Sequence, residues 1–356
     1  MALPATMTAV GLSKTGPSFD VIEEFKFPVP TPSPTQIPIK ACSPGRVHWA
    51  GVNFSDTQKI QGTWPLPLPP FPFTLGIECL GTIVALPTDK AVLSDEEYTV
   101  RRFAVGSKVV SWSAGMTSAG TFAEYLVAEW SDVFPVPDGI PDRTAVASFV
   151  PGCTAVPLAT EAYNVQPGDT VLVHTVAGSV GLAFAQLAKA RGATVIGTTS
   201  TRAKAAFAAQ SGVDHVIVYK EEDVAARVLE LTGGLGVHAI FDGVGKDTFQ
   251  TDLACIRAKG TIVWLGFASG PVEPFAPHIT ASKAVKYLFA SSIAYTGDKK
   301  AGREYVAEVF RLVASGALKP VVHGEYPLSA AGVREAEQAM AEGRTSGKYL
   351  VKVAAD

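Results

Sequence analysis

The sequence has no apolar run long enough to cross a bilayer, and it has little charge. Of its 356 residues, 18% are charged and 47% are hydrophobic, and no stretch reaches the roughly 18 apolar residues that a membrane-spanning helix needs. Lysine and arginine are scattered, and the formal net charge is −3, so no basic surface for nucleic acid or anionic lipid is predicted. Residues 1–16 lack the basic and then apolar pattern of a signal peptide. We therefore expect a cytoplasmic protein with no membrane partner and no nucleic-acid partner.

Cysteine is also scarce and widely spaced. The four cysteines are Cys42, Cys79, Cys153 and Cys255. No two of them have the short spacing of a disulfide framework or of a structural zinc site. We expect buried free thiols in a reducing compartment.

What the sequence does contain is a change of pattern near residue 145. Before it, short apolar runs alternate with Pro and Gly turns, which is typical of a partly open β-barrel. After it, strands alternate with helices of 10 to 15 residues, which predicts an α/β unit with a doubly wound parallel sheet. We expect the late strand at residues 348–353 to return to the first part. The predicted domains are therefore a discontinuous one, residues 1–145 with 303–356, and a nucleotide-binding one, residues 146–302.

The clearest chemical signal is the segment at residues 171–181, where an apolar strand enters a small-residue turn and then a helix. Gly178 lets the backbone approach a pyrophosphate, and Gly181 lets the helix pack closely on the strand. The free amides of Ser179 and Val180 then face an anion at the positive end of the helix. The pattern predicts a dinucleotide-binding loop.

The next strand, residues 194–197, determines the form of the dinucleotide. An Asp or Glu near its end would bind a free ribose 2′-hydroxyl, but the sequence continues as GTTSTRAK to residue 204. The hydroxyls of Thr199 and Ser200 and the cations of Arg202 and Lys204 suit a 2′-phosphate instead. We therefore predict NADPH as the cofactor.

Six segments in order resemble the zinc-free quinone oxidoreductases, the zeta-crystallin-like family of the medium-chain dehydrogenase/reductase superfamily. They are residues 51–57 (GVNFSDT), 152–155 (GCTA), 175–181 (TVAGSVG), 216–223 (VIVYKEED), 241–248 (FDGVGKDT) and 343–348 (GRTSGK). The resemblance implies a GroES-like catalytic domain, a Rossmann domain, NADPH in the cleft between them, and a homodimer.

The same resemblance implies roles for individual residues. Lys204, Tyr219 and Arg344 match positions at the adenosine 2′-phosphate, whereas Asn53 and Thr154 match positions beside the nicotinamide. Val244, Gly266 and Phe267 fall in loops that line its ribose and ring. The candidate catalytic residues are Asn53, Trp64 and Thr154, and the candidate cofactor-binding residues are Asn53, Thr154, Gly178, Ser179, Val180, Gly181, Thr199, Ser200, Lys204, Tyr219, Val244, Gly266, Phe267 and Arg344.

A metal is not expected. Zinc-dependent relatives use Cys and His ligands, but this chain has Asn53 in place of the catalytic Cys, and Ile77 in place of the His of the Gly-His-Glu motif. Glu78, which follows, is expected to have a structural role, paired with a buried basic or amide partner. An electron-poor acceptor can take hydride directly from nicotinamide when the two are aligned and water is excluded. We therefore predict an enzyme that reduces quinones with NADPH.

Departures from the family leave two alternatives open. Related enoyl-thioester reductases have a proton-donating tyrosine where this chain has Trp64, and an indole cannot replace a phenol in that role. Trp64 is expected to wall the acceptor pocket, and Gln58 stands where many quinone reductases have a tyrosine. One alternative is an NADPH-dependent alkenal or enone double-bond reductase. The other is a non-catalytic NADPH-binding structural or RNA-binding protein.

Two insertions, residues 42–49 and 87–102, are predicted to form surface loops because Pro, Gly and charged residues dominate them. His48 or Trp49 of the first could contact substrate. His174, at the end of the first nucleotide-binding strand, is expected to pack and hydrogen-bond rather than catalyse.

Overall fold

The computed structural model describes residues 4–40, 42–43, 46–112 and 120–353, with side chains described outside residues 41–47. The chain forms two compact units. Unit 1 consists of residues 1–150, 298–310 and 321–356, and unit 2 of residues 151–297 and 311–320. The domain boundaries predicted above stay a prediction.

Unit 1 is built from sheets that are antiparallel except where β18 pairs parallel with β19 in the C-terminal segment. One sheet has the order β2-β1-β7, and the larger has the order β10-β3-β8-β6-β19-β18, with β9 pairing both β8 and β11. A separate pair, β4-β5, is short. The strands are β1 (Thr6–Leu12), β2 (Ile22–Pro28), β3 (Gln36–Lys40), β4 (Cys42–Ser43), β5 (Arg46–Val47), β6 (Trp49–Gly51), β7 (Phe73–Thr74), β8 (Glu78–Ile83), β9 (Lys108–Trp112), β10 (Tyr125–Glu129), β11 (Val133–Pro135), β18 (Val322–Pro327) and β19 (Lys348–Lys352).

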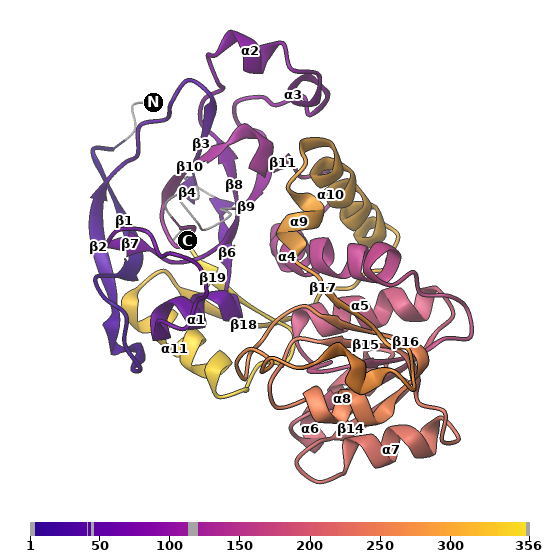
Figure 1. The fold of residues 1–356 in the computed structure, drawn as a ribbon. Coiled ribbons are helices and arrows are strands. Elements are labelled where there is room, and N and C mark those ends of the chain that lie inside the picture. The colour runs from indigo at the N-terminus through magenta and orange to yellow at the C-terminus, as the bar shows by residue number, and fades with distance from the viewer. Residues whose placement is uncertain (1–3, 41, 44–45, 113–119, 354–356) are drawn as a thin grey trace. The chain divides into compact units, whose positions relative to one another are not determined.

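The last strand returns to the first part of the chain, as predicted. β19 pairs antiparallel with β6, with Leu350 opposite Gly51 and Val351 opposite Ala50. Figure 1 shows this yellow strand and helix α11 (Ala330–Ala341) beside the indigo N-terminal strands. Val333, Ala336 and Ala339 of α11 are buried at spacings of three residues, so one face of this helix completes the core of unit 1.

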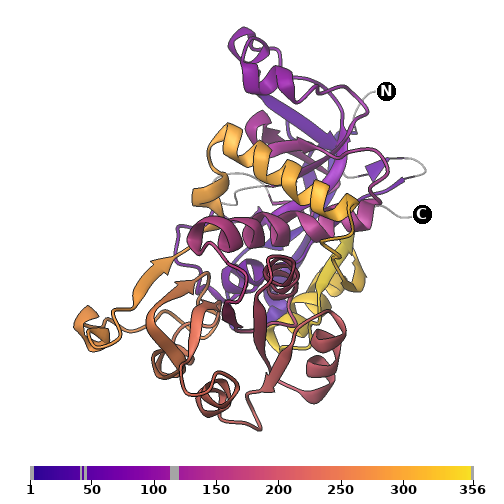
Figure 2. The same cartoon turned by 90° about the vertical axis from the view of Figure 1, so that its right-hand side faces the viewer.

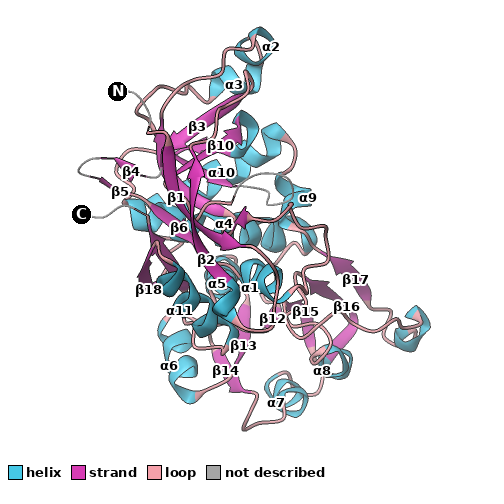
Figure 3. Cartoon of the chain, turned by 90° about the vertical axis from the view of Figure 1, so that its left-hand side faces the viewer, coloured by secondary structure: helices cyan, strands magenta, loops and turns pink. Residues whose placement is uncertain are grey.

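Unit 2 is a parallel sheet flanked by helices. Among the described residues its strand order is β14-β13-β12-β15-β16-β17, and Figure 3 shows these strands with helices α5 to α8 around them. The sheet confirms the predicted doubly wound α/β fold. The elements are β12 (Thr170–Val173), α5 (Ser179–Ala190), β13 (Thr194–Thr199), α6 (Arg202–Gln210), β14 (His215–Val218), α7 (Val224–Leu231), β15 (Val237–Asp242), α8 (Phe249–Cys255), β16 (Ile256–Trp264) and β17 (Lys286–Phe289).

The elements of this unit that the sequence pattern missed include helix α8 and strand β17. Helix α8 is short, and β17 is an edge strand whose Phe289 is 55% exposed. Figure 2 shows this orange segment at the border of the sheet. An edge strand has one unpaired side and only partial burial, so it lacks the continuous apolar run that marks the central strands.

Several helices complete the chain. Helices α4 and α10 each contribute residues to both units. The remaining elements are the α-helices α1 (Phe54–Gln61), α4 (Asp142–Pro157), α9 (Ser292–Thr296) and α10 (Lys299–Ala314), the 3-10 helices η1 (Phe19–Val21), η2 (Trp130–Asp132) and η4 (Pro277–Thr280), and the π-helix η3 (Leu158–Ala162).

The prediction of a surface loop is wrong for the second insertion. Residues 87–102 contain two short helices, α2 (Lys90–Leu93) and α3 (Glu96–Val100), each started by an aspartate whose carboxylate accepts from backbone amides. Asp89 and Asp95 are these N-caps, the role for which short acidic side chains are favoured. The acidic residues that indicated a loop are therefore helix starts.

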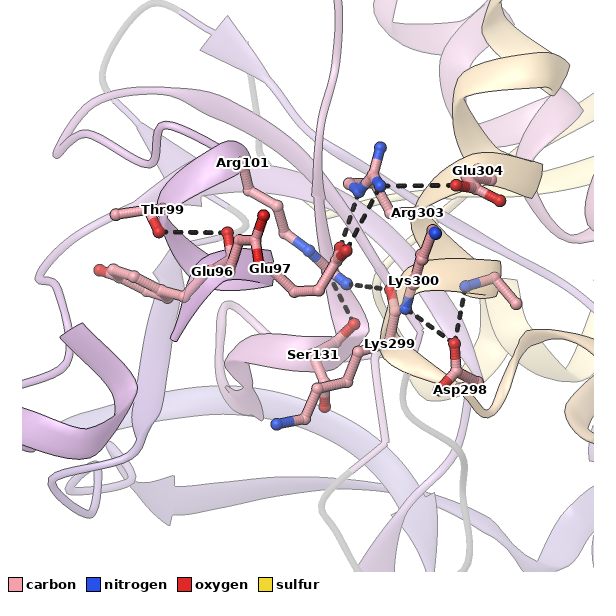
Figure 4. Close-up of polar contacts among 12 residues, drawn as sticks. Glu96, Glu97, Thr99, Arg101, Ser131, Asp298, Lys299, Lys300, Arg303 and Glu304 are labelled. Carbon is pink, nitrogen blue, oxygen red and sulfur yellow. Dashed lines mark hydrogen bonds and ion pairs between the residues drawn. The ribbon is translucent and has the colours of Figure 1, made fainter. Parts of the chain in front are cut away.

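This insertion is tied to the beginning of α10 within unit 1 (Figure 4). Arg101 is only 5% exposed, and its guanidinium donates to the carbonyls of Ser131 at 2.7 Å and Lys299 at 2.9 Å. Glu97 pairs with Arg303 at 2.7 Å. A buried guanidinium surrounded by carbonyl oxygens fixes the backbone segments that supply them.

The first insertion also differs from the prediction at its end. His48 is 1% exposed and its Nε2 lies 3.2 Å from Thr82 Oγ1, and Trp49 is 3% exposed at the start of β6. Both side chains are part of the folded core, so the surface-loop prediction is wrong for them. The side chains of residues 42–47 lie outside the described part.

Candidate cofactor and acceptor site

The turn between β12 and α5 presents free backbone donors. Helix α5 starts at Ser179 after Gly178, and no side chain caps it. In the described residues, the amides of Ser179 and Val180 donate to no protein acceptor. Unpaired amides at the start of a twelve-residue helix form a favourable position for a phosphate.

Gly181 is required by packing. A Cβ built on Gly181 would lie 2.8 Å from Thr175 O and 2.8 Å from Val176 Cα, whereas one on Gly178 would meet only Thr175 O at 3.4 Å. The helix therefore approaches the preceding turn more closely than any side chain at 181 permits. At Gly178, in contrast, the added Cβ would be in ordinary contact with one backbone atom.

Cations gather where β13 and β14 end. Lys204 is half-buried, and burial, followed by the charge of Lys220, lowers its pKa. No carboxylate of the described chain lies within ion-pair distance of either lysine. Arg202, by contrast, pairs with Glu221 at 2.8 Å. Two neighbouring ammonium groups without an anion suit an anionic ligand.

The predicted hydroxyl and aromatic residues lie at the same end of the sheet. Thr199 ends β13 and is 3% exposed, Ser200 follows it half-buried, and Tyr219 follows β14 with 48% of its surface exposed. The Tyr219 amide donates to Thr199 O at 3.0 Å. The structure thus brings Thr199, Ser200, Lys204 and Tyr219 together. The exposed phenol of Tyr219 is accessible to a ligand, whereas the buried Thr199 is not.

The loops after β15 and β16 pack against each other. The amide of Ser269 donates to Val244 O at 2.9 Å and that of Ala268 to Gly243 O at 3.0 Å. A Cβ on Gly266 would come within 3.0 Å of Gly243 O. Val244, Gly266 and Phe267 are therefore neighbours at the carboxyl end of the sheet, where open α/β sheets bind ligands. Thr154 of the same unit is half-buried on α4.

In unit 1, Asn53 precedes α1 with its side-chain amide already engaged. Its Nδ2 donates to Gly51 O at 3.1 Å and to Glu78 Oε1 at 3.0 Å, while its Oδ1 accepts from Lys348 Nζ at 2.7 Å. An amide has two donor hydrogens, and both are used. Asn53 can therefore offer a ligand only the second lone pair of Oδ1.

Glu78 has the buried partners that were predicted for it. It is fully buried and pairs with Lys348, itself 2% exposed, at 2.5 Å. Its other oxygen accepts from Val150 N at 3.0 Å. Sequence reasoning missed Lys348 as a site residue. The available signal was a lysine directly before the apolar residues 349–351, in a sequence with a buried glutamate that needed a basic partner.

The buried charge extends along α1 to α11. Asp56 accepts from the amides of Gly76 and Asn53, and Thr57 Oγ1 donates to Glu337 Oε2 at 2.7 Å. Burial, and then the negative charge of Asp56, raise the pKa of Glu337 well above its usual value. This region is therefore a buried polar core in which Glu337 Oε1 has no hydrogen-bond partner.

Comparison with known proteins determines the family. The model for the alcohol dehydrogenase GroES-like domain matches residues 46–138, and the zinc-binding dehydrogenase model matches residues 179–314. A probable quinone oxidoreductase of Schizosaccharomyces pombe is 34% identical over 342 residues, 96% of each chain. The chain belongs to the quinone oxidoreductase family of the medium-chain dehydrogenase/reductases.

A solved structure agrees with this assignment. The Escherichia coli quinone oxidoreductase complexed with NADPH matches with a TM-score of 0.86 and 30% identity, covering 97% of this chain and all of that one. The predicted GroES-like domain and Rossmann domain are thereby confirmed. This quinone oxidoreductase family member is an NADPH:quinone oxidoreductase-type enzyme with a nicotinamide cofactor. The non-catalytic alternative is therefore wrong.

A further relative differs in the acceptor that its name gives. The 2-haloacrylate reductase of a Burkholderia species is 34% identical over 271 residues, 75% of each chain. Family membership therefore leaves the acceptor of this quinone oxidoreductase family enzyme to be argued from its own residues.

Trp64, the predicted pocket wall, lies against a cation. The Lys59 ammonium is 5.6 Å from the centroid of the indole ring, and Lys59 is 3% exposed. Within the described chain no carboxylate is at ion-pair distance from Lys59, and Trp64 Nε1 is buried without an acceptor. The buried indole N–H of Trp64 is therefore an unsatisfied donor, which is costly unless a ligand or solvent accepts from it.

The last candidate residue, Arg344, belongs to unit 1, whereas Lys204 and Tyr219 belong to unit 2. Arg344 is exposed and pairs with Glu342 at 2.7 Å.

The described residues contain no group of three metal-ligating side chains that could hold a metal ion. They also contain no helix long and apolar enough to span a membrane.

Proposed function

We propose that this enzyme reduces quinones with NADPH by direct hydride transfer without a metal. The observation that carries the cofactor assignment is the combination of the free amides at the start of α5 with the unpaired Lys204 and Lys220. Together they suit a dinucleotide with three phosphates. The names of the relatives support a quinone as the acceptor.

In this proposal each group of residues has a defined task. The amides of Ser179 and Val180 hold the pyrophosphate, with Gly178 and Gly181 shaping the turn. Ser200, Lys204, Tyr219 and Arg344 are assigned to the 2′-phosphate, and the buried Thr199 supports Tyr219 through its backbone carbonyl. Asn53, Thr154, Val244, Gly266 and Phe267 place the ring, and Trp64 excludes water from the acceptor. Bound nicotinamide supplies a hydride to an electron-poor acceptor held at near-attack distance. The domain assignment, the homodimer and the cytoplasmic location are further parts of the proposal.

Substituting Lys204 by alanine is expected to weaken NADPH binding by about 10- to 100-fold while NADH binding changes less than about twofold, because one charge-assisted contact to phosphate is worth about 1.5–3 kcal/mol. Fluorescence titration of both cofactors measures this. Arg202→Ala is the comparison variant: Arg202 was predicted beside the same phosphate but is paired with Glu221, so its substitution is expected to weaken NADPH binding less than K204A does. Equal losses for NADPH and NADH in K204A would refute the proposed site.

The acceptor is tested by the rate of NADPH oxidation with a panel of ortho-quinones, para-quinones, 2-alkenals, cyclic enones and 2-alkenoates. NADH and a chelator serve as controls. Chelator-insensitive turnover that is fastest with quinones supports the proposal, and turnover confined to the other acceptors overturns it.

A second candidate function is reduction of a conjugated carbon–carbon double bond. The observation that favours it is Lys59, a buried lysine whose ammonium lies against Trp64 and has no carboxylate within ion-pair distance in the described chain, although its charge acts on the buried Asp56 and Glu337. The 2-haloacrylate named for the Burkholderia relative is a conjugated carboxylate. An ammonium group near the acceptor would favour such an anionic substrate over a neutral quinone.

Lys59→Met is therefore expected to separate the two functions. If the acceptor is an alkenoate, kcat/KM for alkenoates falls at least tenfold more than kcat/KM for neutral quinones, because only the anionic acceptor loses a charge pair. Steady-state kinetics with both acceptors gives the ratio. A parallel decrease for both classes would mean that Lys59 serves the stability of unit 1 alone.

A further inference from the structure

A buried histidine and aspartate meet beneath the cofactor turns of unit 2. His174 Nε2 lies 2.9 Å from Asp252 Oδ1, and His174 Nδ1 lies 3.0 Å from Thr198 Oγ1. The side chains of His174 and Asp252 are 3% and 0% exposed. They come from the end of β12 and from α8, so the pair joins two elements that are distant in sequence.

On one side this pair reaches the turn that precedes α5. The amide of Thr175 donates to Thr198 Oγ1 at 3.4 Å, and the amide of Val176 donates to Thr198 O at 3.0 Å. Thr175 has a φ of 56°, a left-handed conformation that a β-branched residue adopts only when its surroundings impose it. Thr198 thus holds this strained residue at the start of the glycine turn, and His174 holds Thr198.

On the other side lies the carboxylate that builds the turn at residues 243–248. Asp242 is fully buried; its Oδ1 accepts from Val244 N at 2.6 Å and its Oδ2 from Thr248 Oγ1 at 2.7 Å. Helix α8, which carries Asp252, starts directly after this turn. The charge of Asp242 acts on both His174 and Asp252. The three ionisable groups therefore form one buried cluster between two cofactor turns.

We propose that His174 and Asp252 are positioning residues for the cofactor: their hydrogen bond fixes the glycine turn at residues 175–181 relative to the turn at residues 243–248, and so determines dinucleotide affinity. This inference rests on the cofactor turns assigned in the proposed function. It concerns binding of the cofactor and is independent of which acceptor is reduced.

The protonation of the cluster should be visible in binding. Burial, and then the Asp242 charge, raise the pKa of Asp252 to about 6 despite the opposing effect of His174. Burial lowers the pKa of His174, but Asp252 more than offsets this, so the net shift is upward. The other titratable group nearby, Cys255, has a pKa raised to about 12 by burial and remains neutral. Below pH 6, Asp252 therefore loses its charge and the ion pair with His174.

The test is NADPH affinity, measured by fluorescence titration of the whole enzyme, in two variants of one residue. Asp252→Asn keeps an acceptor for His174, and its Kd is expected to stay within about threefold of wild type at pH 7.5. Asp252→Leu removes the acceptor at similar volume, and its Kd is expected to rise at least tenfold. Thr198→Val removes the hydroxyl that is hydrogen-bonded to His174 Nδ1. If D252L does not fold, T198V is an independent variant with the same expected rise in Kd.

A matched control separates positioning from stability. Val228→Ala makes a cavity in α7, away from both turns, and lowers the melting temperature of unit 2. If V228A keeps wild-type affinity while D252L or T198V loses it, the proposal stands. If D252L and T198V bind NADPH as V228A does, the pair is structural only and the proposal is overturned. Wild-type protein that does not bind NADPH at all would instead refute the proposed function.

The pH profile supplies a readout that a purely structural role would not change. The Kd of wild type divided by the Kd of D252N is compared between pH 5 and pH 8, which cancels the titration of the cofactor's own 2′-phosphate. D252N is expected to bind about two- to threefold more weakly than wild type at pH 8, and the ratio is expected to rise toward 1 below pH 6, because protonated Asp252 is then as uncharged as the amide in D252N. A ratio that stays constant would contradict the assigned coupling.

Discussion

Replacing Lys348 with methionine is expected to lower the free energy of unfolding by about 3–5 kcal/mol, because removing one partner of a buried ion pair leaves the other charge uncompensated. Lys348 and Glu78 are 2% and 0% exposed and 2.5 Å apart. Methionine fills a similar volume, so the loss reports the charge and not a cavity. Urea denaturation followed by tryptophan fluorescence measures it.

Two further variants show whether this interpretation is correct. The double variant E78Q/K348M removes both charges and is expected to recover most of the loss. Lys189→Met breaks a pair with Asp214 that is 2.6 Å long but 38% and 27% exposed, and should cost less than about 1 kcal/mol. A loss below about 1 kcal/mol for K348M would mean that the pair is solvated in solution.

The same substitution should also change the site. Lys348 Nζ donates to Asn53 Oδ1, and Asn53 Nδ2 donates to Glu78. These bonds point the amide oxygen of Asn53 toward Lys348 and its nitrogen toward Glu78. Without Lys348 the Oδ1 of Asn53 loses its donor while its Nδ2 keeps Gly51 O and Glu78, so the residue proposed beside the nicotinamide would be held at one end of its amide only.

Replacing Gly181 with alanine is expected to weaken cofactor binding at least tenfold and to cost about 1–3 kcal/mol of stability. The added Cβ would lie 2.8 Å from Thr175 O and Val176 Cα, both backbone atoms. Helix α5 must then move away from the turn, and its free amides move with it. Isothermal titration with NADPH and thermal denaturation measure the two effects.

Gly178 is the matched control for this prediction. A Cβ there would meet only Thr175 O, at an ordinary contact distance of 3.4 Å. Gly178→Ala should therefore cost less than about 1 kcal/mol of stability, while still weakening cofactor binding because it places a methyl group beside the free amides. If G181A bound NADPH as well as wild type, the turn before α5 would not be the pyrophosphate site.

The nucleotide-binding unit was largely predictable because its signals are local. An apolar run such as residues 171–173, followed by Gly178 and Gly181, encodes a strand, a turn and a helix within a dozen residues. The alternation of strands and helices that the sequence pattern predicts is seen from β12 through α5, β13, α6, β14 and α7 to β15. β17 was missed because an edge strand carries a weak pattern.

The candidate site was predictable only in part. The prediction that Glu78 has a buried partner followed from a charge among apolar neighbours, but its identity did not, since Lys348 is 270 residues away along the chain and meets Glu78 only through the sheet containing β6, β8 and β19. The buried insertion residues Arg101 and Trp49 were misjudged for the same reason. Their burial depends on segments that sequence spacing does not relate.

The sequence by itself determined the class of fold, because hydrophobic periodicity acts over one or two elements, and it indicated the family through the resemblance of six ordered segments. The glycine spacing of residues 175–181 predicted the dinucleotide turn. Only the tertiary structure decided which charges are paired. Lys348 contacts Glu78 and Asn53, Arg202 pairs with Glu221, and His174 pairs with Asp252. Lys204 and Lys59 have no carboxylate at ion-pair distance in the described chain. The physical reason is that an ion pair requires a few ångströms of separation, and the fold, not the distance along the chain, sets that separation.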